Sequence, residues 1–128
     1  MFFLFFKETI SIMNIIHSSE PLTIEKYFPL FESTGWNVNY KLTPEELNSV
    51  VLKSYFTVSA HSGETLVGFG RIVCDGILHA IIYEMIIHSD YQLKGIGSEI
   101  LKMLLKKCKD DNIRDIQLFC AKGKRVFY

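Results

Sequence analysis

The sequence has no excess of charge of either sign, because 14 lysines and arginines balance 14 aspartates and glutamates. It also has no basic tract, whereas proteins that bind nucleic acid through its phosphates gather basic residues into a patch or stripe. The balance therefore argues against a general nucleic-acid-binding protein. It does not exclude the binding of a small anionic ligand, because the N-terminus of a helix supplies local positive potential without any net charge.

Cysteine is scarce, and the three residues present are widely spaced: Cys74, Cys108 and Cys120. An odd number without a C-x-x-C pair provides neither a disulfide framework nor a zinc-binding pattern. The four histidines are isolated along the chain and add no cluster of metal ligands. We therefore expect no metal site, and reduced, partly buried thiols in a cytoplasmic protein.

Long apolar runs of the kind that span a membrane are also missing. The N-terminal run at residues 2–6 is far shorter than the ~20 apolar residues that cross a bilayer, and it lacks the basic region and cleavage site of a signal peptide. Met13 lies just beyond it and is an alternative start. We expect residues 1–12 to be an N-terminal extension or part of the first strand, residues 13–128 to form one domain, and no membrane partner.

The first half of the chain predicts one strand and two helices. β-branched residues at 10–16 indicate the strand, and apolar residues at helical spacing indicate helices over 23–33 and 43–54. The second helix begins with the signature of a capping box, Thr43-Pro44-Glu45-Glu46. Residues 36–40 between the helices are expected to form a loop.

Three further stretches predict strands, at residues 56–60, 66–74 and 78–87. The turn signals Ser62-Gly63-Glu64 and Asp75-Gly76 join them, so we expect an antiparallel meander. A helix over 95–109 and a strand over 113–121 should complete a right-handed parallel crossover. The predicted fold class is α/β (α+β), with a mixed, mostly antiparallel sheet flanked by helices.

Two glycines, Gly95 and Gly97, mark the turn between the last strand of the meander and the following helix. Free N–H groups at a helix start favour bound phosphate. The Walker A spacing is absent, and Ile100 stands where a Rossmann fingerprint needs its third glycine. A Rossmann-like nucleotide binder is therefore a distant alternative. A plain turn without a ligand is disfavoured, because two glycines at a helix start cost stability.

The segment Gln92-Leu93-Lys94-Gly95-Ile96-Gly97 resembles the acyl-CoA signature Gln-x-x-Gly-x-Gly of the GNAT superfamily of N-acetyltransferases. Residues 84–88, 65–71 and 126–128 resemble the family's fourth strand, third strand and C-terminal Phe-Tyr segment. The resemblance covers nearly the whole chain from Ile15, and it implies the GNAT acyl-CoA N-acyltransferase fold. In that fold the Phe-Tyr segment precedes the rest of a helix and two strands, so we expect a truncated chain whose last strands are missing.

The resemblance implies acetyl-CoA as the co-substrate. The pantetheine arm would lie beside the fourth strand and bond to the backbone of Met85, Ile86 and Ile87, much as an added strand would. Glycine would let the pyrophosphate approach the loop without a Cβ in the way, and two side chains of the loop, Gln92 and Lys94, would add donors. The pyrophosphate would lie over the residues Gln92, Leu93, Lys94, Gly95, Ile96, Gly97 and Ser98.

The resemblance also implies an acid and a base. Glu84 lies within an apolar strand, where burial should raise its pKa toward the working pH of a base; an ion pair with Arg71 is the structural alternative. Tyr128 is the expected acid for the departing thiolate, and packing against the last helix is its alternative. Trp36 and Tyr40 are expected to line the acceptor pocket.

The predicted activity is transfer of an acetyl group from acetyl-CoA to a primary amine of a small molecule or peptide. The amine would attack directly in a ternary complex, with a backbone N–H near Ile86 polarising the carbonyl. The alternative is a catalytically impaired CoA-binding module or fragment. The expected partners are the amine and a second copy in a homodimer, with no nucleic acid and no metal.

Overall fold

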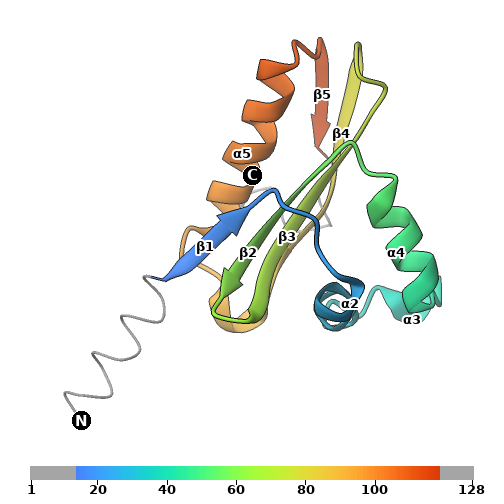
Figure 1. Ribbon diagram of the computed structural model, residues 1–128, viewed down its shortest axis with the longest axis vertical. Helices are drawn as coiled ribbons and strands as arrows, with labels where there is room; N and C mark the ends of the chain where they lie inside the picture. Colours follow the sequence, from blue (N-terminus) through green and yellow to red (C-terminus); the bar gives the residue numbers. More distant parts are fainter. Residues whose placement is uncertain (1–13, 119–128) are drawn as a thin grey trace.

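The computed structural model describes residues 14–118. The expected extension at residues 1–12, Cys120 and the C-terminal segment with Tyr128 lie outside these described residues. Figure 1 shows a sheet with helices on both of its faces. The elements, in chain order, are β1 (Ile15–Ser18), α2 (Ile24–Glu32), α3 (Asn37–Tyr40), α4 (Pro44–Leu52), β2 (Phe56–Ser62), β3 (Thr65–Cys74), β4 (His79–Ile87), the 3-10 turn η1 (Ser89–Tyr91), α5 (Ile96–Asp110) and β5 (Asp115–Leu118).

The five strands lie side by side in the order of the chain, β1-β2-β3-β4-β5. The first four are antiparallel to their neighbours, and β5 lies parallel to β4. The predicted meander, the parallel crossover through α5 and the mixed α/β class are therefore confirmed. Within the described sheet only the β4–β5 pairing is parallel, so the Rossmann alternative, which needs a parallel sheet, is wrong.

The helices divide between the two faces of the sheet (Figure 1). α5 packs on β2, β3 and β4, whereas α2 packs on β3 and on α4 over the opposite face. Each face therefore has its own apolar core. The core under α5 contains Val58, Ile72, Ile82, Ile100 and Leu104. The core under α2 contains Tyr27, Leu30, Phe31, Leu47 and Phe69.

Two glycines in β3 allow α5 to lie close to the sheet. A Cβ on Gly70 would lie 2.8 Å from Met85 Sδ and 3.0 Å from both Ile100 Cγ2 and Leu104 Cδ1. A Cβ on Gly68 would lie 2.9 Å from Ile100 Cδ1. Because protein interiors are close-packed, a side chain at either site would require the contacting side chains of α5 and β4 to shift. The sequence predicted a strand over residues 66–74 and gave no reason for the glycines at 68 and 70.

The prediction of a loop at residues 36–40 was wrong, because Asn37–Tyr40 forms the short helix α3. The buried Asn37 side chain accepts a hydrogen bond from the Leu42 N–H at 2.7 Å and donates one to the Leu42 carbonyl at 3.0 Å. Lys41 between them adopts a left-handed conformation with φ 55°. The helix thus depends on a side-chain amide bonded to a later backbone group, which hydrophobic spacing does not reveal.

Strand boundaries also differ from the expected ones. β1 continues two residues further than expected, because His17 and Ser18 pair with β2. β2 likewise continues to Ser62, which pairs with Thr65 across the turn. β5 begins at Asp115 rather than at residue 113. In each case backbone pairing with the neighbouring strand, rather than the apolar pattern, decides where the strand ends.

The starts of the two longer N-terminal helices, α2 and α4, differ in their capping. Thr43 Oγ1 accepts from the Glu46 N–H at 3.1 Å, and Glu46 Oε1 accepts from the Thr43 N–H at 3.0 Å, which completes the predicted capping box of α4. Thr23 precedes α2, but its side chain makes no cap hydrogen bond. Gly35 has φ 80° just beyond α2, as a glycine that ends a helix does.

The C-terminal end of α5 is anchored to the sheet by a polar contact. The Tyr55 hydroxyl, just before β2, donates to Asp111 Oδ2 at 2.5 Å, and Lys107 Nζ lies 3.1 Å from the same carboxylate. The hydrogen bond raises the pKa of Tyr55 to about 12. The same hydrogen bond, followed by that from Lys107, lowers the pKa of Asp111. Tyr55 therefore has a structural role, because it ties the end of α5 to the start of β2.

We predict that Gly70→Val destabilises the protein by about 1–3 kcal/mol, because the new side chain overpacks the interface between β3 and α5. Urea denaturation would measure the change. Thr65→Ala is the control, since Thr65 lies on the same strand with an exposed side chain and should change stability by less than about 0.5 kcal/mol. Equal stability of Gly70→Val and the wild type would show that α5 does not need the glycine.

We predict that Asp111→Asn lowers the urea midpoint at pH 7 and has much less effect at pH 3. A carboxylate whose pKa is lowered by folding stabilises the protein fully above its ordinary pKa of 3.8, and the contribution is lost as the pH falls through the lowered value.

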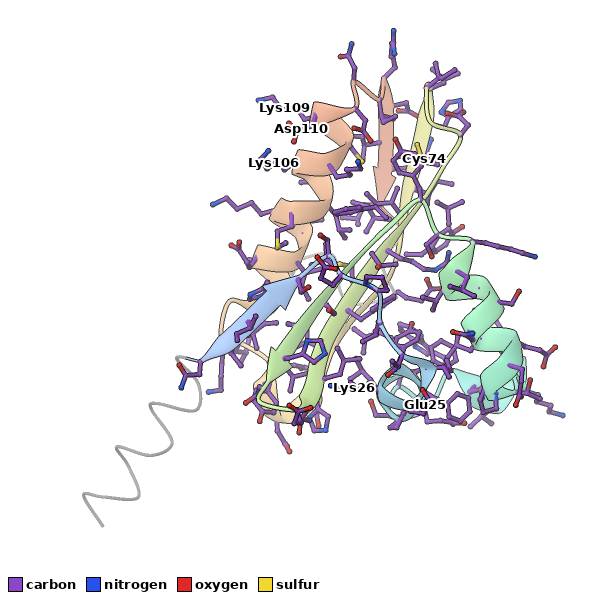
Figure 2. All side chains as sticks on the ribbon, viewed as in Figure 1. Glu25, Lys26, Cys74, Lys106, Lys109 and Asp110 are labelled. Atoms are coloured by element: carbon purple, nitrogen blue, oxygen red, sulfur yellow. The ribbon has the colours of Figure 1, made fainter. Side chains whose placement is uncertain are left out.

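Asp110→Asn is the matched control for this change. Asp110 pairs with Lys106 at 2.7 Å on the outer side of α5 (Figure 2). Exposed pairs at this spacing contribute little, so its midpoint should stay near that of the wild type at both pH values. An unchanged midpoint of Asp111→Asn at pH 7 would refute the anchoring role of the Tyr55–Asp111 contact.

Candidate functional site

The connection from β4 to α5 is a tightly turned loop. His88 Nδ1 accepts a hydrogen bond from the Asp90 N–H at 3.1 Å, and Gln92 Nε2 donates to the Ile87 carbonyl at 3.2 Å. Leu93 and Gly95 both have positive φ, 63° and 82°. The Gln92 side chain thus ties the loop back to the end of β4, and the two left-handed residues turn the chain into α5.

The start of α5 carries free backbone donors. In the part of the chain that the structure describes, the N–H groups of Ile96, Gly97 and Ser98 have no acceptor, whereas the next N–H, of Glu99, donates to the Gly95 carbonyl at 3.1 Å. The N-cap residue is Gly95, so no side chain competes for these amides. Such a helix start suits an anion.

β4 contains a bulge at its centre, which the sequence did not predict. Phe69 of β3 pairs with Ile86, and Arg71 pairs with Tyr83, so Gly70 alone faces two residues of β4, Glu84 and Met85. Glu84 has φ 49°, a conformation that favours glycine. The extra residue shifts the side-chain alternation, so that Met85 packs toward the α5 core and Ile86 toward the α2 core.

Beyond the bulge, β4 pairs with β3 along one of its two edges, so its backbone N–H groups point alternately toward β3 and away from it. The His88 N–H donates to the Val67 carbonyl at 2.8 Å, and N–H groups alternate in direction along a strand. The Ile86 N–H therefore points toward β3 and the Ile87 N–H away from it. On the other edge, β5 pairs with β4 only from His79 to Ile82 within the described residues.

Glu84 forms an ion pair with Arg71 Nε, and their side chains are 22% and 13% exposed. Arg71 Nη1 also donates to Ser54 Oγ at 3.3 Å, and the guanidinium lies 5.7 Å from the centre of the Tyr83 ring. The buried Tyr27 hydroxyl lies nearby, and burial, followed by the Glu84 charge, raises its pKa. The expected alternative for Glu84 is thus present, and its role as a base stays a prediction.

The other expected site residues do not gather around Glu84. Trp36 is half-buried and packs edge to face on Phe31, with the ring centres 6.2 Å apart, so it contributes to the α2 core. Tyr40 is 67% exposed at the end of α3. Tyr128 lies outside the described residues. Their roles in acceptor binding and proton transfer therefore stay predictions.

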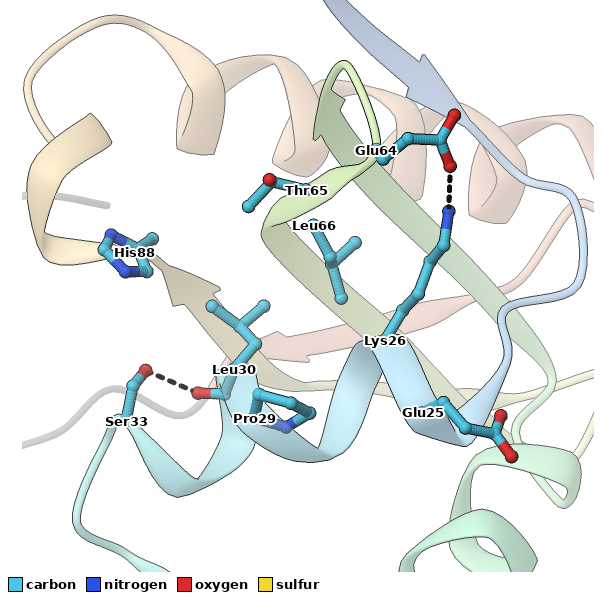
Figure 3. A pocket seen from close by; sticks show the side chains of 9 residues that line it. All are labelled: Glu25, Lys26, Pro29, Leu30, Ser33, Glu64, Thr65, Leu66 and His88. Atoms are coloured by element: carbon cyan, nitrogen blue, oxygen red, sulfur yellow. Dashed lines mark hydrogen bonds and ion pairs between the residues drawn. The ribbon is translucent and has the colours of Figure 1, made fainter.

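A cleft of about 340 Å³ lies beside the loop, between α2, the start of β3 and the end of β4 (Figure 3). At its mouth Lys26 Nζ lies 3.3 Å from Glu64 Oε2. Sequence reasoning missed this cleft, because residues far apart in the chain form it. The cleft is lined by Glu25, Lys26, Pro29, Leu30, Ser33, Glu64, Thr65, Leu66 and His88.

Among residues 14–118, no group of three or more histidine, cysteine, aspartate or glutamate side chains is placed to hold a metal ion. No helix in the same range is long and apolar enough to cross a lipid bilayer.

Comparison with known sequences identifies relatives of this domain. A family model described as an acetyltransferase (GNAT) domain matches residues 30–128. An uncharacterized N-acetyltransferase ycf52-like protein of Prochlorococcus marinus is 30% identical over 77% of this chain and 56% of its own length. The ycf52 protein of Gracilaria tenuistipitata is 31% identical over 77% of this chain and 55% of its own length. The chain thus spans a little over half of these curated relatives.

Solved structures share the fold. A Staphylococcus aureus protein described as a probable acetyltransferase matches with a TM-score of 0.75 and 22% identity, over 89% of this chain and 85% of its own. A GNAT family acetyltransferase of Streptococcus pneumoniae matches with a TM-score of 0.73 and 25% identity, over 88% of this chain and 80% of its own. The PaiA N-acetyltransferase of Thermoplasma acidophilum, solved with coenzyme A, matches with a TM-score of 0.68 and 19% identity, over 89% of this chain and 84% of its own. These structures show that the fold is shared, and the family model over residues 30–128 together with the curated relatives shows the family: the chain belongs to the GNAT family of acetyltransferase domains.

Proposed function

We propose that this domain transfers an acetyl group from acetyl-CoA to a primary amine of a small molecule or peptide. The observation that carries the proposal is the row of free N–H groups at the start of α5, directly after a bulged strand of a GNAT domain. The names of the curated relatives, which call them N-acetyltransferases, support it. A cytoplasmic location and a homodimer stay predictions.

In this proposal the pyrophosphate of acetyl-CoA binds at the loop between β4 and α5. A phosphate can approach Gly95 because nothing lies within 4 Å of the position of a Cβ there. The amides of Ile96, Gly97 and Ser98 supply donors along the positive end of the helix dipole. Lys94 adds an exposed cation, whereas the Gln92 side chain already holds the loop against β4.

The pantetheine arm would lie along the edge of β4 that faces away from β3, as an added strand does. The alternation of the strand beyond the bulge turns the N–H of Ile87 away from β3. Ile87, rather than Ile86, is then the better donor to the arm, and the donor expected near Ile86 is assigned to this neighbour. Met85 lies within the bulge, where the regular ladder is disrupted, so its expected contact with the arm stays a prediction.

The reaction needs a deprotonated amine, although alkyl amines have a pKa of ~10.4 when they resemble lysine. In the proposed mechanism Glu84 accepts the amine proton, directly or through a water, and the amine nitrogen attacks the thioester carbonyl. A backbone N–H of β4 stabilises the oxyanion that develops. The carbon–sulfur bond then breaks, and the thiolate takes a proton from an acid, for which Tyr128 is the predicted residue.

We predict that Gly95→Val weakens CoA binding by about 10- to 100-fold, because it removes charge-assisted contacts between the phosphates and the loop. Isothermal titration calorimetry would measure the affinity. Gly35→Val is a matched control, since Gly35 has φ 80° against 82° for Gly95 and equally open surroundings. It carries the same backbone strain away from the loop, so its affinity should stay within about threefold. Unchanged affinity of Gly95→Val would show that the phosphates bind elsewhere.

We predict that Glu84→Gln lowers kcat by about 10²- to 10⁴-fold with little change in CoA affinity, because glutamine cannot take the proton. Its side-chain oxygen can still accept from Arg71, so the strand should keep its shape. Release of the CoA thiol across a panel of primary amines would measure turnover. Full activity of the variant would exclude Glu84 as the base. Tight CoA binding by the wild type without thiol release for any amine would favour the CoA-binding module instead.

A further inference from the structure

The guanidinium of Arg71 links the bulge of β4 to the end of α4. Its Nε pairs with Glu84, and its Nη1 donates to Ser54 Oγ at 3.3 Å after the end of α4. Its Cζ lies 5.7 Å from the centre of the Tyr83 ring, next to Glu84 on β4. The buried Tyr27 of α2 approaches the same charges from the helical side. Arg71 itself follows Gly70, the residue of β3 that faces the bulge.

The bulge needs such support, because its backbone is strained. Glu84 has φ 49° within a strand, where a side chain with a Cβ is disfavoured. The three other non-glycine residues with positive φ among the described residues, Lys41, Leu93 and Asn112, all lie in connections between elements. A strained residue in the middle of a sheet persists only when its surroundings hold it there.

Stability alone does not account for the ion pair. Both side chains are largely buried, and removing two charges from water offsets much of their mutual attraction. Buried pairs are often no more stabilising than apolar residues of similar size, whereas they do specify one geometry. The planar guanidinium suits this task, because it can bond the carboxylate and the Ser54 hydroxyl at fixed angles.

We propose that Arg71 is a positioning residue for acetyl transfer, which holds the β4 bulge in register through Glu84. The register of β4 beyond the bulge decides which of its N–H groups turn away from β3, and one of these is the N–H of Ile87. In the proposed function this N–H faces the pantetheine arm and the thioester. The bulge also places the Glu84 carboxylate on the α2 side of the sheet, beside Tyr27. This inference rests on the proposed function, since it assigns Arg71 a task in the same site.

The first test compares two ligands by calorimetry and needs no turnover. In Arg71→Met, CoA should bind about tenfold more weakly, since one or two hydrogen bonds to the arm are lost. Adenosine 3′-phosphate 5′-diphosphate, which has the phosphates without the arm, should bind as it does to the wild type. Arg71→Lys should lie between, because a single ammonium can pair with Glu84 without bonding Ser54 as well. Equal weakening of both ligands, or of neither, would overturn the proposal.

The second test asks whether Arg71 acts through Glu84. When Glu84 is present, Arg71→Met should lower kcat by about 10²-fold. In a Glu84→Ala variant, where the ion pair is already absent, the same substitution should lower kcat by much less. If the two substitutions lower kcat independently, so that their fold-losses multiply in the double variant, the proposal is overturned. Asp110→Asn, which breaks the exposed pair with Lys106 on α5, is the control and should leave kcat unchanged.

The two tests keep the failure of this inference apart from failure of the proposed function. If the wild type binds CoA but releases no thiol with any amine, the proposed function fails, and the comparison of the two ligands still decides the role of Arg71. If the wild type is active and Arg71→Met is equally active with unchanged CoA affinity, only the role of Arg71 fails.

Discussion

The backbone pairing of β3 with β4 is the constraint on which the rest of the site depends. β4 has one more residue than β3 between the pairs Phe69–Ile86 and Arg71–Tyr83, and the extra residue is accommodated opposite Gly70. A glycine there leaves space for Met85 and for α5 on the same face. The bulge of β4 and the close packing of α5 therefore meet at one position of β3, Gly70.

The domain obtains positive potential without a basic surface. Its net charge is zero, yet the N–H groups at the start of α5 have no acceptor among the described residues and lie next to the exposed Lys94. On the α2 side of the sheet the charges are arranged differently, since Arg71 and Glu84 neutralise each other beside a mostly apolar layer. The groups that we propose for phosphate binding and for proton transfer thus belong to two different parts of the domain, the start of α5 and the centre of β4.

Much of the architecture could be predicted from residue patterns. The meander, the parallel crossover and the capping box at Thr43 follow from short-range rules, and they are confirmed because local preference and tertiary pairing agree there. The prediction for residues 36–40 was wrong, because the Asn37 side chain bonds to the backbone of Leu42. The cleft beside α2 was missed, since its lining comes from three separate segments.

The sequence by itself determined the order of the elements and the place of the glycine loop before α5, because glycine spacing and apolar periodicity are local properties of the chain. Only the tertiary structure decided what Glu84 contacts, since its direction depends on a bulge that two strands create together. It also showed why β3 has glycine at positions 68 and 70, where α5 leaves no room for a side chain. Contacts between distant segments carry no signal in a single sequence, so the ion pair of Arg71 with Glu84 could be offered only as an alternative until the strands were in place.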